Sequence, residues 1–367
     1  MAAPKGAGAC AELLATHAAE AGLASALDPA PRTHDLTALL GSNPFLMAPM
    51  AGVSDAAYRV MARAGGAGFA YTEMVSVAGI HFSGEKTWEL VIPDECEPDI
   101  AVQLFGSDPS QFAEAATAVQ ERLGNKLLLI DVNMACPVPK VTRKGEGSAL
   151  MGDPDRAAEI VRAVAGSCEV PTTVKIRAGR TADAMVAPEF ARRMVDAGAA
   201  AVAVHGRFAS QFYRGESDRG VVEAVAGAVD VPVIGSGDVL SARAAVDMVE
   251  CAGCAGSFVA RGTYGNPWVV SNARRLLAGE PEVAPTSEQR LSALACHVLL
   301  LEATGAHLAR ARSAAGWFLK GMPDASTWRD RAMRCRTVDD YLALVSALRA
   351  QLAEEGAARA AEGERRA

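Results

Sequence analysis

The chain has 367 residues, of which 50% are hydrophobic, 5% aromatic and 22% charged. This length can bury a large core and favours one barrel with a single appended domain over three small domains. The formal net charge of −7 excludes a globally basic surface of the kind typical of nucleic-acid-binding proteins, so a nucleic-acid partner would have to meet a local basic patch.

Residues 1–40 are rich in alanine and predict an accessory N-terminal extension or a partly disordered segment. From residue 41 onwards, short apolar runs alternate with amphipathic helical segments at intervals of roughly 30 residues, the length of one βαβ unit. Eight such units predict an α/β fold, a (β/α)8 TIM barrel over residues 41–284. The expected strands are 45–49, 68–74, 101–105, 127–134, 172–177, 200–206, 231–237 and 256–262.

Polar, glycine or proline residues end most of these strands. Because the carboxyl ends of barrel strands face the active-site mouth, we expect these residues to converge on one face of the barrel. They are Pro49 and Met50, Gln103, Asn133 to Cys136, Lys175 and Arg177, His205 and Arg207, Ser236 to Asp238, and Arg261 with Gly262.

The pattern changes after residue 285 to helices without strands, expected at 291–308, 309–321 and 337–350. We therefore expect an all-α helical domain at 285–352, followed by a charged flexible tail at 353–367. A basic cluster lies beside Trp317, Phe318 and Trp328, which suggests an RNA-binding surface, although a solvated helix face has the same pattern. The basic cluster consists of Lys320, Arg329, Arg331, Arg334 and Arg336.

Eight cysteines are scattered along the chain without a secretory signal, a pattern that indicates reduced thiols and a cytoplasmic location. No apolar stretch is long enough to span a bilayer. Cys251 and Cys254 form a Cys-x-x-Cys pair, but a redox or zinc role needs a second ligand pair or a thioredoxin-like context. We expect the pair to mark a packed helix end with Gly253 as its stop, and we predict no metal site.

The segment 131–140 reads DVNMACPVPK and closes the apolar run 127–130, which places the Cys136 thiol at the mouth of a buried strand. Free cysteines often serve only as small buried hydrophobes. The nearby Asn133, Lys140 and Arg143 favour a chemical role instead, because reactive cysteines lie in electropositive, partly open surroundings.

Seven separated motifs carry a family resemblance. They are MAPMAGVSDAAYR at 47–59, VQLFG at 102–106, DVNMACPVPKVTRKGEGSAL at 131–150, VKIRAG at 174–179, VHGRFASQFYRG at 204–215, VPVIGSGD at 231–238 and ARGTYGNPW at 260–268. Together they resemble the tRNA-dihydrouridine synthases, most closely the bacterial B-type branch. The sequence WFLKGMP at 317–323 is similar to the helical RNA-binding domain of that family.

The resemblance implies an FMN enzyme that reduces a specific uridine of tRNA to 5,6-dihydrouridine with NADPH as reductant. We expect a monomer, although the sequence carries no direct signal of oligomeric state. Hydride addition at carbon 6 of uracil leaves an enolate that needs a proton at carbon 5. A thiol with an ordinary pKa is mostly protonated at neutral pH, so the resemblance and the chemistry both favour Cys136 as the acid.

The remaining roles are also implied by the resemblance. Pro49, Met50 and Ala51 would line the flavin ring, Gln103 would bind its polar edge, and Lys175 would stabilise the reduced anionic form. His205 would contact the flavin, and Asn133 would hold the uracil. Arg177 and Arg207 would help to hold the RNA. The phosphate would lie among Ser236, Gly237, Asp238, Ala260 and Arg261.

Three positions depart from the family pattern, since Ala135 and Ala260 replace glycines and Ser236 replaces an asparagine. These departures predict weaker FMN retention. Two alternatives stay open: an FMN-dependent dehydrogenase of a free pyrimidine, similar to dihydroorotate dehydrogenase, and a non-catalytic tRNA-binding protein.

Overall fold

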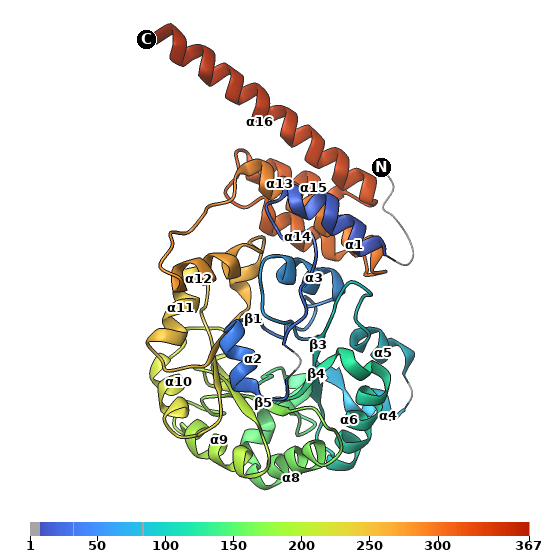
Figure 1. Cartoon of the computed structure of the whole chain (residues 1–367), viewed down its shortest axis with the longest axis vertical. Coiled ribbons are helices and arrows are strands. Elements are labelled where there is room, and N and C mark those ends of the chain that lie inside the picture. Colours follow the sequence, from blue (N-terminus) through green and yellow to red (C-terminus); the bar gives the residue numbers. More distant parts are fainter. Residues whose placement is uncertain (1–7, 32, 83, 367) are drawn as a thin grey trace.

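The computed structural model describes residues 8–31, 33–82 and 84–366, with side chains described as far as residue 357. Eight parallel strands curl around a common axis inside a ring of helices, as the sequence predicts (Figure 1). Neighbouring strands follow in the order β1-β8-β7-β6-β5-β4-β3-β2. Their bounds are β1 Phe45–Met47, β2 Val75–Ser76, β3 Ile100–Phe105, β4 Leu127–Asn133, β5 Thr172–Arg177, β6 Ala201–His205, β7 Val233–Ser236 and β8 Gly256–Val259.

The second strand differs from the expected range 68–74. In that range the chain makes only isolated bridges, from Ala70 to Met47 of β1 and from Tyr71 to Ala101 of β3, and the regular ladder begins at Val75. These bridges close the barrel between β1 and β3. The apolar run 68–74 does form part of the barrel wall. The position of its regular ladder depends on the neighbouring strands, so the sequence of the run alone could not locate it.

Helices cover the outside of the barrel and one helix closes its amino-terminal end. The closing helix is α2, Leu36–Ser42, which starts where the Asp35 carboxylate accepts the N–H of Thr37 at 2.8 Å. Its Leu39 and Leu40 pack with the inward side chains of the strands. The covering helices are α3 Ala56–Ala64, α4 Val77–His81, α5 Glu85–Val91, α6 Pro109–Leu123, α7 Pro139–Thr142, α8 Pro154–Ala165, α9 Ala187–Asp196, α10 Arg219–Ala226, α11 Ala242–Glu250 and α12 Val269–Leu277.

The Cys251-x-x-Cys254 pair follows the end of α11, as expected. Cys251 is the exposed C-cap residue, Gly253 has φ +64°, and Cys254 is buried. The pair therefore belongs to a helix stop.

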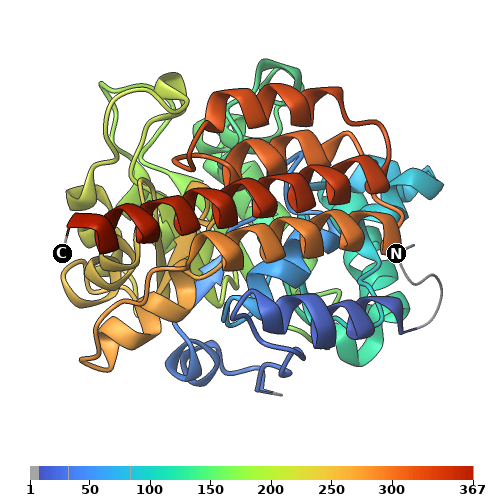
Figure 2. The same ribbon diagram turned by 90° about the horizontal axis from the view of Figure 1, so that it is seen from above.

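The C-terminal region is all helix, and its helices lie side by side against one side of the barrel, next to α3 (Figure 2). They are α13 Ser287–Ala303, α14 Arg310–Phe318, α15 Ala325–Arg334 and α16 Val338–Arg366. The sequence did not predict α15, because this polar helix buries only Trp328 and Ala332. Helix α16 runs on to Arg366 through the segment where a flexible tail was expected, because alanine, glutamate and arginine are strong helix formers.

The N-terminal segment packs against this helical region. Helix α1, Ala9–Leu13, continues as a single π-helical stretch, Leu14–Ala18, and lies beside the helical region (Figure 1). Its buried side chains share one core with those of α13. The indole of Trp268 donates a hydrogen bond to the carbonyl of Ala21 at 2.9 Å. The segment thus connects the helical region to the barrel. Residues 1–7 of the expected extension lie outside the described residues. Within the described chain, no helix is both long and apolar enough to cross a membrane.

Candidate active site

The carboxyl ends of the strands surround a cavity of about 500 Å³. All of the site residues expected from the sequence line it except Arg207. Polar side chains come from five neighbouring strands and their loops, so the barrel brings together residues that are far apart in the chain. The residues from these strands that line the cavity include Gln103 of β3, Asn133 and Cys136 after β4, Lys175 and Arg177 of β5, His205 of β6 and Ser236 of β7.

The Cys136 loop is fixed by the side chain of Asn133. The amide oxygen of Asn133 accepts the N–H groups of Ala135 at 3.2 Å and Cys136 at 2.9 Å, and its Nδ2 donates to Gln103 Oε1 at 2.8 Å. Asn133 therefore positions the thiol, and one N–H of its amide remains beyond the bond to Gln103. Cys136 is half-buried, and burial raises the pKa of its thiol above the ordinary value. The thiol is therefore protonated at neutral pH.

A buried carboxylate lies behind these amides. Asp131 accepts hydrogen bonds from Gln103 Nε2 and from the Thr173 hydroxyl, both at 2.6 Å. Burial raises the pKa of Asp131 to about 6, although both hydrogen bonds and the charge of Lys175 act in the opposite direction. The chain Asp131–Gln103–Asn133 thus fixes the direction of both amides.

Lys175 is a buried cation of the cavity, beside the equally buried Arg177. Burial, reinforced by Arg177, lowers the pKa of its ammonium group to about 8, while Asp131 partly offsets this effect. The ammonium group therefore stays largely protonated at neutral pH and is poorly hydrated, which strengthens its attraction for an anionic ligand.

His205 is neutral at this site. Burial, followed by the charges of Lys175 and the nearby arginines, holds its pKa well below the ordinary value. Nη1 of Arg207 lies 3.3 Å from Nε2 of His205. An arginine can only donate, so Nε2 accepts and the ring proton lies on Nδ1.

The two arginines expected to hold RNA are instead occupied within the protein. Arg207 is 2% exposed and binds the Asp238 carboxylate at 2.6 Å and the carbonyl of Gly215. Arg177 lines the cavity, but it donates to the carbonyls of Ala135 at 2.7 Å and Phe212 at 3.0 Å. Arg177 therefore connects the Cys136 loop with the loop after β6, and both arginines act on the shape of the site.

Backbone donors lie free where a phosphate was expected. Among the described residues, the N–H groups of Gly237, Asp238 and Arg261 make no hydrogen bond to the protein. Gly237 has φ +115°, and a Cβ on it would lie 2.1 Å from the Ser217 hydroxyl, so only glycine fits. Asp238 orients Arg261 through a 2.8 Å ion pair. Free amides beside an arginine can accept an anion without a particular side chain at 236 or 260.

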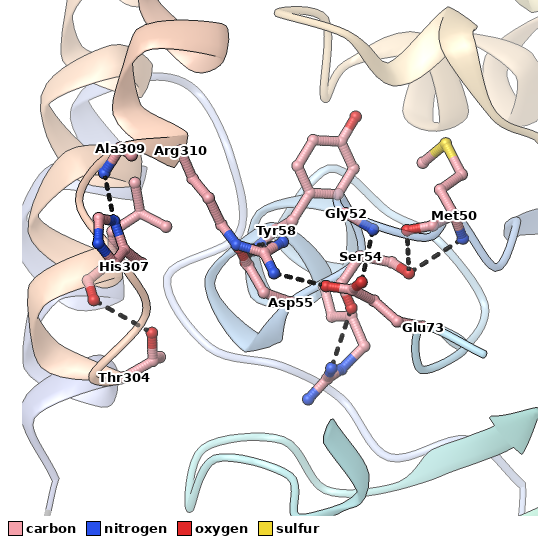
Figure 3. Close-up of polar contacts among 12 residues, drawn as sticks. Met50, Gly52, Ser54, Asp55, Tyr58, Glu73, Thr304, His307, Ala309 and Arg310 are labelled. Atoms are coloured by element: carbon pink, nitrogen blue, oxygen red, sulfur yellow. Dashed lines mark hydrogen bonds and ion pairs between the residues drawn. The ribbon is translucent and has the colours of Figure 1, made fainter. Parts of the chain in front are cut away.

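The loop 48–54 forms another wall of the cavity and is braced from behind (Figure 3). The Ser54 hydroxyl accepts the N–H of Met50 at 3.0 Å and donates to its carbonyl at 3.1 Å. The Glu73 carboxylate accepts the N–H of Gly52 with one oxygen and binds Arg310 Nη2 at 2.7 Å with the other. Arg310 belongs to α14, so the helical region braces a wall of the cavity.

Asp55 completes this brace. One carboxylate oxygen caps α3 by accepting the N–H of Tyr58 at 2.8 Å, and the other lies 3.1 Å from Arg310 Nη1. Burial raises the pKa of Asp55, while its bond to Tyr58 and the charge of Arg310 oppose the shift. Arg310 thus compensates two acidic side chains that are each about 10% exposed.

Replacing Arg310 with methionine should lower the free energy of unfolding by about 2 kcal/mol, between the values for exposed and fully buried ion pairs. The pKa of Asp55 would rise further, and a raised carboxyl pKa favours the folded state only at low pH. The loss should therefore grow toward neutrality and shrink as the pH falls through the folded-state pKa of Asp55, which lies above the ordinary aspartate value of 3.8. Urea unfolding at several pH values measures this. Adding Asp55→Asn and Glu73→Gln to the Arg310 variant should restore part of the stability, because both unpaired carboxylates are then removed. A loss that does not depend on pH and is not recovered in this way would contradict the prediction.

Sequence reasoning missed several residues of the site. Asp131, Glu73 and Arg310 act through long-range contacts that no local pattern reveals. Tyr213, 63% exposed, lies at the cavity with the guanidinium groups of Arg177 and Arg261 each 5.8 Å from its ring centre. The available signal in the sequence was a tyrosine next to Arg214 in the loop that follows the sixth strand.

The basic cluster on the helical region is exposed, but two of its three aromatic neighbours are buried. Trp328 and Phe318 are each 3% exposed, and Trp317 stacks on Tyr264 at 4.0 Å. Phe318 and Trp328 therefore pack the helical core and are not exposed beside the basic residues as the sequence suggests, whereas Trp317 is half-buried at the contact with the barrel. Arg331 covers the Trp328 ring at 4.3 Å, and Arg334 pairs with Asp330. All five basic residues still face solvent.

The chain is a TIM barrel with a cavity at the carboxyl ends of its strands, which is where such barrels bind ligands. Free backbone amides, a buried lysine and a thiol line this cavity. The family model described as dihydrouridine synthase (Dus) matches residues 46–354. The chain therefore belongs to the dihydrouridine synthase family.

Curated relatives agree over most of the chain. A probable tRNA-dihydrouridine synthase of Treponema pallidum (strain Nichols) is 36% identical over 312 residues, covering 81% of this chain and 91% of that protein. The tRNA-dihydrouridine synthase B of Xanthomonas axonopodis pv. citri is 35% identical, covering 82% and 90%. That of Pseudomonas aeruginosa is 35% identical, covering 83% and 92%.

Proposed function

We propose that this protein reduces a uridine of tRNA to 5,6-dihydrouridine, with FMN bound in the barrel cavity and NADPH as the reductant. The observation that carries the proposal is the convergence of a protonated thiol, a buried lysine and free backbone amides on one cavity of about 500 Å³. That volume falls within the range of cofactor sites, about 300–1,000 Å³. The family match supplies the substrate class.

The residues present fit FMN. The amides of Gly237, Asp238 and Arg261 would hold its phosphate, and Pro49, Met50 and Ala51 would border its ring. Gln103 keeps one N–H beyond its bond to Asp131, and this N–H would meet the polar edge of the ring. Bound FMN supplies the hydride that the reduction of uracil requires.

The chain's own groups provide the remaining chemistry. Asn133 aims the Cys136 loop into the cavity, and the Cys136 Sγ holds the proton that uracil needs at carbon 5. Neutral His205 adds no charge, and Arg177 donates to protein carbonyls, so Lys175 would be the cation that favours an electron-rich ligand ring. Arg177 shapes the rim by holding the loops on either side of the cavity. The target base would have to leave its stack to reach this depth.

Two measurements test the proposal together. The purified full-length chain, reconstituted with FMN, should show a bound-flavin spectrum and should oxidise NADPH. Dihydrouridine mapping of tRNA should lose one defined set of positions in cells that lack the gene and regain it on complementation. Reduction of a free pyrimidine without tRNA would favour the dihydroorotate dehydrogenase-like alternative. Failure to bind flavin, with tRNA still bound, would favour the non-catalytic alternative.

Replacing Lys175 with methionine should weaken FMN binding, because the cavity loses the buried ammonium group while Arg177 stays bonded to protein carbonyls. In the wild type, affinity should fall as the pH rises through about 8 and the ammonium group loses its proton. The variant should lack this pH dependence. Equilibrium titration of FMN fluorescence measures both effects, with Lys86→Ala, an exposed lysine of α5 outside the cavity, as the control. Equal affinity and the same pH profile in Lys175→Met would exclude this role.

A further inference from the structure

We propose that Cys10, Asp94 and Cys96 form a binding site for a thiolate-preferring divalent cation of the Zn²⁺ class. The two thiol sulfurs and a carboxylate oxygen lie within 4.8 Å of one another. Cys10 comes from α1 and the other two residues from the loop after α5, so the fold brings together segments that are distant in the sequence. This separation explains why the sequence predicts no metal site.

The donor set and its spacing suit zinc. Zinc takes thiolate ligands at about 2.3 Å and carboxylate oxygens at about 2.0–2.2 Å in a tetrahedron, which places neighbouring ligand atoms roughly 3.5–3.8 Å apart. A small contraction of the observed cluster reaches this geometry. Cys10 is 2% exposed, whereas Asp94 and Cys96 are half-buried. Three protein ligands thus leave the fourth position to water from the solvent side.

The ligand loop is held rigid before any ion binds. The backbone N–H of Asp94 donates to the Glu97 carboxylate at 2.8 Å, and Glu97 forms a two-point ion pair with Arg59 of α3 at 2.7 and 2.8 Å. The N–H of Cys96 donates to Asp94 Oδ1 at 3.0 Å, which orients the carboxylate and leaves its second oxygen for a cation. Hydrogen-bond partners of metal ligands fix the orientation of those ligands and raise the affinity for the metal.

The charges around the cluster balance a bound ion. Binding of Zn²⁺ would release two thiol protons to solvent, and two thiolates with one carboxylate would give the occupied site a net charge of −1. Lys126 Nζ donates to the carbonyls of Asp94 at 3.2 Å and Glu95 at 3.3 Å, so a cation already lies beside the loop.

Occupation of the site would fasten the N-terminal segment to the barrel. Helix α1 packs its buried side chains on α13 of the helical region, while the loop 94–99 is anchored to α3 by buried ion pairs. The N-terminus of α1 already touches this loop, because Gly8 N–H donates to the Glu95 carboxylate at 3.2 Å. A metal here would therefore join three parts of the fold and restrain the helical region on the barrel.

Cobalt and zinc titration of the full-length protein, purified with a phosphine reductant and a chelator and then freed of the chelator, tests the proposal without reference to catalysis. One equivalent of Co²⁺ should produce a thiolate charge-transfer band and the intense visible bands of tetrahedral cobalt, and Zn²⁺ should abolish both. Zinc should also raise the thermal midpoint, because a ligand that binds only the folded state stabilises it. Absence of cobalt bands together with an unchanged midpoint would overturn the proposal.

Matched variants identify the ligands. Removing a residue that only supports a metal ligand lowers metal affinity by about 10–100-fold. Removing a ligand itself costs more, so Cys10→Ser and Cys96→Ser should each lower the cobalt affinity by more than about 100-fold. Cys251→Ser, an exposed cysteine outside the cluster, should leave the bands intact. Bands that survive Cys10→Ser but vanish in Cys136→Ala would assign the metal to the active-site thiol and overturn the proposal. A Cys10–Cys96 disulfide that persists in the reductant would also overturn the proposal; it would lower the measured mass of the protein by two hydrogens.

Discussion

Replacing Cys136 with alanine should lower the rate of dihydrouridine formation by about 10²–10⁴-fold, the usual worth of a positioned general acid. FMN binding, tRNA binding and flavin reduction by NADPH should stay within a small factor of the wild type, because the Asn133 amide also holds the backbone of the loop. Burial keeps the pKa of this thiol above its ordinary value of 9.0, so the wild-type rate should not decline until the pH rises beyond that value. Single-turnover reduction of tRNA measures the step directly.

Two control variants make this result specific. Cys251→Ala removes an exposed thiol outside the cavity and should leave the rate unchanged. Cys136→Ser keeps the size of the side chain but provides a much weaker acid, so its rate should stay close to that of the alanine variant. A wild-type rate in Cys136→Ala would show that another group donates the proton. An equal loss of FMN binding would show that Cys136 shapes the cavity.

The barrel was predictable because each strand carries its own signal. An apolar run identifies a buried parallel strand, and the polar residue that ends it lies at the carboxyl-terminal face of the barrel. The strand-end pattern therefore predicts that Gln103, Asn133, Lys175 and His205 meet, and all four line the same cavity. The second strand was misplaced because its ladder depends on partners at Leu104 and Phe105.

Features that depend on contacts between distant segments could not be predicted in the same way. The sequence shows Arg207 next to a strand end, but only the folded loop shows that Asp238 and the carbonyl of Gly215 occupy its guanidinium group. Trp328 stands among arginines in the sequence, yet its ring faces the helical core. Arg310 and Glu73 meet only because α14 packs beside the loop after β1. In each case the partner decides the role of the residue.

Reversing the charges of Arg331, Arg334 and Arg336 to glutamate should weaken tRNA binding by about 10²–10³-fold at roughly 0.1 M salt if each arginine meets one phosphate. The slope of log affinity against log salt concentration should decrease in magnitude by about 3. All three side chains are exposed, and none lines the cavity, so flavin reduction by NADPH should be unchanged. Filter binding or anisotropy with whole tRNA over a range of salt concentrations measures both quantities.

The matched control reverses Arg156, Arg193 and Arg243, which lie on the barrel helices α8, α9 and α11 and are each about half exposed. It imposes the same change in net charge but leaves the helical region untouched. A local phosphate-binding surface predicts a large loss of affinity only in the first triple variant, because contacts, and not the total charge, release counterions. Equal losses in both would indicate general repulsion by an acidic protein. Because Arg331 also covers the buried Trp328 ring, Arg331→Gln is needed to show that the helical core stays folded. A salt slope unchanged in the first triple variant would identify the cluster as a solvated helix face and would place the tRNA elsewhere.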